Sequence, residues 1–121
     1  MEEKYYNIKA VTRREKEAAL REALCEMGIE VMAVTQVEGS GIQEGVMSYI
    51  ENGKGVLMLI PKIMVEIITT EENAVQKIID MIVQTCRTGL LGDGKIFIEE
   101  CNGSMIGFRP TEEKKQEIPL C

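Results

Sequence analysis

Eleven residues, RTGLLGDGKIF from Arg87 to Phe97, combine residue types that could bind an anion at a joint between two regular elements. Gly89, Gly92 and Gly94 lack a Cβ, so their backbone N–H groups are open to a ligand, and Lys95 adds a positive charge. Each charge-assisted hydrogen bond contributes about 1.5–3 kcal/mol, so a few of them could bind a phosphate group. The alternative is that Gly89 ends a helix and Gly-Asp-Gly forms a tight turn with nothing bound. The pattern alone leaves both interpretations open.

The same stretch satisfies the phosphate-loop pattern G-x-x-x-x-G-K, but the rest of that motif is missing. Ile96 occupies the place of the Ser or Thr that would bind magnesium. The glycines also run from a helix into a strand, whereas the loop of nucleotide triphosphatases leaves a strand and opens a helix. We therefore exclude that class of enzyme, and we expect the Leu90–Leu91 pair to be buried.

The composition limits the classes of partner. The chain has 121 residues, which predicts one domain, and its 45% hydrophobic and 28% charged residues are typical of a globular protein. A net charge of -6 repels nucleic acid and anionic lipid, so an anionic ligand must be held by a local feature. We find no apolar run of about 20 residues and no signal peptide, which predicts a cytoplasmic protein without an integral membrane segment.

Cysteine and histidine usage argues against a metal centre and against catalysis. Cysteines at 25, 86, 101 and 121 form no CxxC pair, and the chain has no histidine. We expect Cys25 and Cys86 to be core thiols rather than disulfide partners or zinc ligands. Without a histidine base or a nucleophilic serine motif, no catalytic residue is predicted, and the protein is not expected to be an enzyme.

Apolar periodicity gives the order of the elements. Strands are predicted over 6–12, 29–37, 56–69 and 95–100, and helices over 14–27, ended by Gly28, and from an N-cap at Thr70 to Gly89. Residues 38–55 carry five glycines and predict a long loop, and 105–108 form a short extra strand or an ordered tail. One apolar stripe per helix predicts an α+β, ferredoxin-like βαββαβ domain over residues 1–121, with both helices on one face of the sheet.

At this point the sequence resembles a known family. TGLLGDGKIF resembles the signature of the PII nitrogen-regulatory signal-transduction proteins, and the likeness extends through REAL, GIEVMAVTQVEGSGIQEG and LIPKIMVEII. The resemblance implies a homotrimer with a long T-loop, here about 38–55, and an irregular C-terminal tail over about 103–121. It also implies competitive binding of ATP or ADP in clefts between subunits, sensing of 2-oxoglutarate with Mg-ATP, and control of a target protein through the T-loop.

Position by position, the resemblance implies two groups of site residues. Residues of the nucleotide site are Ala33, Gly39, Glu66, Gly92, Asp93, Gly94, Lys95 and Arg109. Residues of the 2-oxoglutarate site are Gly41, Gln43, Glu44, Gly45 and Lys62, with the Gln43 amide oxygen on the magnesium of the bound nucleotide.

Several positions depart from the family pattern. Ile42 replaces an arginine of the T-loop, Ala33 replaces a threonine on the adenine side, and Gly107 leaves Arg109 in place of two arginines of the tail. Loss of these guanidinium groups predicts weaker ATP binding, or a shift towards ADP or AMP. Gly55 stands at the tyrosine that is modified in the family, which excludes uridylylation there.

Two functions follow from these observations. The first is a sensor that binds adenine nucleotide at subunit clefts and regulates a transporter or a metabolic enzyme, in nitrogen or related metabolism. The second keeps the trimer and the loop but replaces the nucleotide, giving a constitutive adaptor or a sensor of another small anion such as bicarbonate.

Overall fold

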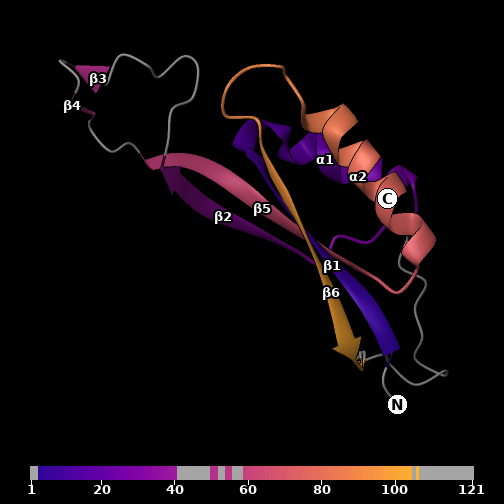
Figure 1. The fold of residues 1–121 in the computed structure, drawn as a ribbon. Helices are drawn as coiled ribbons and strands as arrows, with labels where there is room; N and C mark the ends of the chain where they lie inside the picture. The colour runs from indigo at the N-terminus through magenta and orange to yellow at the C-terminus, as the bar shows by residue number, and fades with distance from the viewer. Residues whose placement is uncertain (1–2, 41–49, 52–53, 56–58, 105, 107–121) are drawn as a thin grey trace, which may run out of the picture.

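The computed structural model describes residues 3–40, 50–51, 54–55, 59–104 and 106. Its main body is a four-stranded sheet with two helices packed against one face (Figure 1). The elements, in chain order, are β1 (Glu3–Arg13), a 3-10 turn (Arg14–Lys16), α1 (Glu17–Glu26), β2 (Ala33–Ser40), β3 (Ile50–Glu51), β4 (Lys54–Gly55), β5 (Leu59–Thr69), α2 (Glu72–Cys86) and β6 (Gly94–Gly103).

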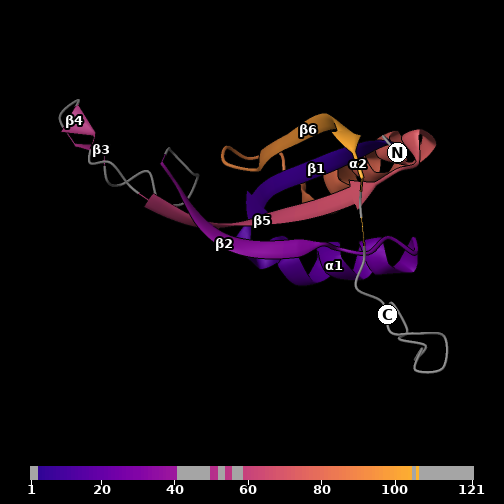
Figure 2. The same ribbon diagram turned by 90° about the horizontal axis from the view of Figure 1, so that it is seen from below.

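The sheet has the strand order β2-β5-β1-β6, and every neighbouring pair is antiparallel. The two β-α-β units therefore interleave, so the predicted ferredoxin-like topology is confirmed. β3 and β4 form a separate two-stranded pair that lies beyond the ends of β2 and β5 (Figures 1 and 2). The prediction of one long loop over 38–55 is therefore wrong in part, because β2 continues to Ser40 and the β3–β4 pair lies within this range.

The core lies between the helices and the facing side of the sheet. Along β1, Ile8 and Ala10 are buried, and along β5 the residues Ile63, Val65 and Ile67 are buried, at the spacing of two that one strand face requires. The helices contribute side chains at four-residue steps, namely Leu20 and Leu24 from α1 and Ile78, Ile82 and Cys86 from α2. Full burial of each large apolar side chain contributes about 1.5–3 kcal/mol, so this alternation fixes which sheet face is covered.

Several element ends differ from the sequence expectations, and three of the differences have a clear physical reason. Thr70 is not the N-cap of α2, because Glu71 holds that position and its N–H donates to the Thr69 hydroxyl at 3.0 Å. α2 ends at Cys86 rather than at Gly89, since Arg87 is already extended with a ψ of 127°. β2 begins at Ala33 rather than at 29, because the Ile29 N–H still bonds back to the Leu24 carbonyl at 2.9 Å.

Candidate functional site

The loop between α2 and β6 is built on glycines that adopt left-handed backbone conformations. Gly89, Gly92 and Gly94 have φ angles of 85°, 92° and 130°. A Cβ at Gly94 would lie 1.9 Å from the Val11 carbonyl oxygen, because β6 starts there directly against β1. The backbone of the turn thus accounts for these glycines, although Gly89 does not end α2 as the simpler interpretation proposed.

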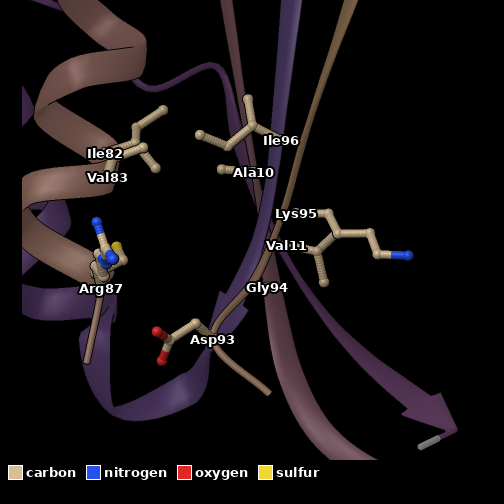
Figure 3. Close-up of a pocket in the computed structure, with 10 residues that line it drawn as sticks. Ala10, Val11, Ile82, Val83, Arg87, Asp93, Gly94, Lys95 and Ile96 are labelled. Carbon is tan, nitrogen blue, oxygen red and sulfur yellow. The ribbon is translucent and has the colours of Figure 1, made fainter. Parts of the chain in front are cut away.

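Asp93 organises this loop through its carboxylate. The carboxylate accepts hydrogen bonds from the Thr88 hydroxyl, from the N–H groups of Thr88 and Gly89 at 2.9 Å each, and from Arg13 Nε at 3.1 Å. These bonds, led by the one from the Thr88 hydroxyl, hold the pKa of Asp93 well below the usual carboxyl value. The Asp93 carboxylate is therefore engaged inside the loop, on the helix side of the sheet, while Lys95 extends to the other side (Figure 3).

A cavity of about 510 Å³ opens on the helix-free face of the sheet, next to this loop. It brings together six of the predicted site residues: Gly39 from β2, Lys62 from β5, and Gly92, Asp93, Gly94 and Lys95 from the loop and β6. Val11, Ile60, Leu90, Leu91 and Phe97 complete its lining. Residues that are far apart in the sequence thus form one site with glycines, two ammonium groups and an apolar wall.

The two lysines of the cavity have different environments. Lys62 Nζ donates to the Gly92 carbonyl oxygen at 2.6 Å, and burial together with the nearby Arg13 guanidinium lowers the pKa of Lys62. Lys95 is exposed and points away from the helices (Figure 3). In a chain with a net charge of -6, these ammonium groups make the cavity a local exception that favours an anion.

The expectation of a buried leucine pair is wrong. Leu90 and Leu91 are 51% and 61% exposed, and both line the cavity. Sequence reasoning also missed Thr12 and Arg13, the two buried polar residues at the end of β1. Both donate side-chain hydrogen bonds to backbone carbonyls of the loop. No local motif marks them, because their partners lie about 80 positions away in the sequence.

Two predicted nucleotide-site residues lie elsewhere on the same sheet. Ala33 and Glu66 are partners in the β2–β5 register, and Glu66 lies near Lys9, with 4.0 Å between the charged atoms. Neither residue lines the cavity. The remaining predicted residues fall outside the described ranges, namely Gly41, Gln43, Glu44, Gly45 and Arg109.

A second cavity, of about 420 Å³, lies on the helix side of β1 and β6 (Figure 3). Ala10 and Ile96 face Ile82 and Val83 across it. The buried Cys86, the last residue of α2, also lines it. Burial raises the pKa of the Cys86 thiol, in accord with the expected core thiol. Cys25 is half-buried and disulfide-bonded, so the expectation of a core thiol there is wrong. Within the described ranges, no group of three or more Cys, Asp or Glu residues could hold a metal ion.

Fold and site together define a ferredoxin-like domain with a glycine loop beside an anion-favouring cavity. The family model for "Nitrogen regulatory protein P-II" matches residues 5–105. The chain is 38% identical over 111 residues to the nitrogen regulatory protein P-II of Klebsiella oxytoca, which covers 92% of this chain and 97% of that protein. It is 37% identical over 111 residues, with the same coverage, to nitrogen regulatory protein P-II 1 of Escherichia coli strain K12. The chain therefore belongs to the P-II family.

Solved structures agree with this assignment. The structure of Arabidopsis thaliana PII bound to citrate superposes with a TM-score of 0.57 and 28% identity, covering 79% of this chain and 76% of that one. The Bacillus subtilis GlnK–ATP complex superposes with a TM-score of 0.65 and 23% identity, covering 81% and 82%. At that identity the second likeness supports the fold alone.

In the described part of the chain, no helix is both long and apolar enough to cross a membrane.

Proposed function

We propose that this protein is a signal-transduction protein that binds an adenine nucleotide in the cavity beside the Gly92–Lys95 loop. The single observation that carries the proposal is the convergence of Gly39, Lys62 and the loop on one cavity. Its volume of about 510 Å³ falls in the range of small-molecule sites. Ammonium groups beside open glycine backbone suit phosphate, and the apolar wall suits a base or a ribose.

The site requires a second copy of the chain if Ala33 and Glu66 also contact the nucleotide. Both lie outside the cavity of their own subunit, in the β2–β5 part of the sheet. The helix-free face is open, with Phe97 51% exposed, and β2 and β6 are edge strands. Pairing of one subunit's β2 edge with the next subunit's β6 edge would close a ring and bury this face, which supports the homotrimer.

The cation and the organic acid have weaker support than the nucleotide. Lys62 could bind a carboxylate of 2-oxoglutarate, because its ammonium has three N–H donors and its bond to the Gly92 carbonyl uses only one of them. Because no metal-binding group exists in the described residues, we expect magnesium to arrive with the nucleotide phosphates. The role of Gln43 on that magnesium rests on the resemblance, since Gln43 lies outside the described ranges.

The proposed readout is a partner protein bound by the T-loop over about 38–55. β2 ends at Ser40, and the cavity lies next to Gly39, one residue before that end. A ligand in the cavity would therefore contact the root of the loop, which would let its occupancy change the loop. We expect this to occur in the cytoplasm, with a transporter or a metabolic enzyme as the target.

Calorimetry with ATP, ADP and AMP, each with and without magnesium and 2-oxoglutarate, tests the proposal. We expect saturable binding of at least one nucleotide, and weaker binding of ATP than a full set of arginines would give. If none of the nucleotides binds, the nucleotide proposal fails. In that case, partner capture that Lys95→Ala leaves unchanged would favour the constitutive adaptor or the sensor of another small anion.

A further inference from the structure

Three consecutive backbone carbonyls of the glycine loop are each held by a side chain from another strand. Arg13 Nη2 donates to the Leu91 carbonyl at 2.7 Å, and Lys62 Nζ donates to the Gly92 carbonyl at 2.6 Å. The Thr12 hydroxyl donates to the Asp93 carbonyl at 3.2 Å. The loop is thus fixed by its surroundings at three successive peptide units.

Fixing a carbonyl also fixes an amide. In a planar trans peptide, the C=O of one residue and the N–H of the next point in opposite directions. The three donors therefore set the directions of the N–H groups of Gly92, Asp93 and Gly94. Those of Gly92 and Gly94 are the glycine backbone donors that the proposed phosphate site depends on, and glycine, which has the widest choice of backbone conformations, has the greatest need of such fixing.

Arg13 differs from Thr12 and Lys62 in that it bonds to the loop at two positions. Its side chain is 6% exposed, and its guanidinium reaches two loop positions, the Leu91 carbonyl through Nη2 and the Asp93 carboxylate through Nε at 3.1 Å. Through Asp93 it is connected to the amides of Thr88 and Gly89 at the start of the loop. Among the described residues, Arg13 does not line the cavity.

We infer that Arg13 is a positioning residue for the nucleotide site: it holds the loop amides in their ligand-binding directions without touching the ligand. The identity of the ligand in this inference rests on the proposed function, whereas the effect of Arg13 on the loop does not. A lysine could replace the charge of Arg13 but not its two-pronged geometry, because an ammonium on a flexible stem lacks the fixed fork of the guanidinium.

The test compares the wild type with Arg13→Lys, Arg13→Gln and Arg14→Gln. Arg14 is the matched control, because it is the exposed neighbour and takes no part in the hydrogen bonds of the loop within the described residues. Dissociation constants for ATP or ADP are measured by calorimetry well below the melting temperature of each variant. A loss of overall stability would then leave the affinity unchanged, so a change in affinity reports the geometry of the loop.

We expect Arg13→Lys to raise the dissociation constant about tenfold or more, the effect of losing one charge-assisted bond, and Arg14→Gln to change it by less than about twofold. Hydrogen exchange should accelerate at the amides of residues 88–94 in Arg13→Lys, while the amides of β5 stay protected. If Arg13→Gln does not fold, Arg13→Lys carries the test alone.

Wild-type affinity in Arg13→Lys, or an equal loss in Arg14→Gln, would overturn the inference. If the wild type binds no nucleotide, the proposed function fails, and the exchange of the loop amides then decides the inference by itself. Unchanged exchange at residues 88–94 in Arg13→Lys would refute it, and selective acceleration there would support it.

Discussion

Replacing Gly94 with alanine should damage the fold far more than its small size suggests. The new Cβ would lie 1.9 Å from the Val11 carbonyl oxygen, 2.9 Å from the Val11 carbonyl carbon and 3.0 Å from Thr12 Cα. All three atoms belong to the backbone of β1, so no side-chain rotation relieves the contact. The φ angle of 130° is also one that alanine rarely adopts.

The size of the effect follows from these two costs. Overpacking against a fixed structure costs about 1–3 kcal/mol, and an unfavourable φ costs about 1–3 kcal/mol more. We therefore expect Gly94→Ala to lower the free energy of unfolding by about 2–6 kcal/mol, a large fraction of the roughly 5–15 kcal/mol that stabilises a domain. The damage should concentrate in the pairing of β1 with β6, which begins there.

Gly89→Ala is the matched control in the same loop. Gly89 has a φ of 85°, but a Cβ there would meet nothing within 4 Å. Gly89→Ala should therefore lower the free energy of unfolding only by the conformational cost, about 1–2 kcal/mol. Urea unfolding followed by circular dichroism measures both variants. Equal losses for Gly94→Ala and Gly89→Ala would refute the close approach of β6 to β1.

Three further predictions concern the loop, the cavity and the open face. Asp93→Asn should lose about 2–3 kcal/mol of stability at pH 7, because the carboxylate accepts charge-assisted bonds. Since the pKa of Asp93 is lowered, this stabilisation is present above the ordinary carboxyl pKa of about 3.9 and is lost as the pH falls below it. Thermal melts from pH 7 to pH 3 should therefore show the difference in stability between the wild type and Asp93→Asn becoming smaller. A difference that stays constant over this pH range would contradict the prediction. Gly39→Ala places a Cβ at an ordinary 3.6 Å from Lys62 Cδ, so unfolding should change by less than about 1 kcal/mol, while Gly39→Leu should narrow the cavity and abolish calorimetric ATP binding. Phe97→Asp should give monomers in light scattering where Phe97→Leu stays trimeric, and an unchanged mass would count against burial of the open face.

Much of the fold could be predicted from the sequence, because apolar periodicity is a local signal. The apolar stripe of each helix and the apolar runs of the strands predicted α2 and β5 along with the other elements, and the topology followed from their order. The element ends were harder to predict. Gly89 was expected to cap α2, yet the chain leaves the helix at Arg87, because Asp93 binds the following amides in competition with a helical cap.

The site could be predicted only in part, for a related reason. The glycines and Lys95 are contiguous, and their gathering with Gly39 and Lys62 was expected through the family resemblance. Arg13 was not found, because its bonds to Leu91 and Asp93 join positions about 80 residues apart and depend on the pairing of β1 with β6. Exposure of Leu90 and Leu91 was likewise missed, since an apolar pair in a loop has the same sequence signature whether it faces the core or a ligand.

The central claim is that an adenine nucleotide binds at the loop through Lys95. Its most direct test is calorimetric titration of ATP and ADP into the wild type, Lys95→Ala and Lys77→Ala. Lys77 is an exposed lysine on α2 that does not line the cavity, so Lys77→Ala removes the same charge from a place away from the cavity. We predict saturable binding by the wild type and by Lys77→Ala, and loss of about tenfold or more in affinity for Lys95→Ala. Equal affinity of all three proteins, or no binding by the wild type, would contradict the claim.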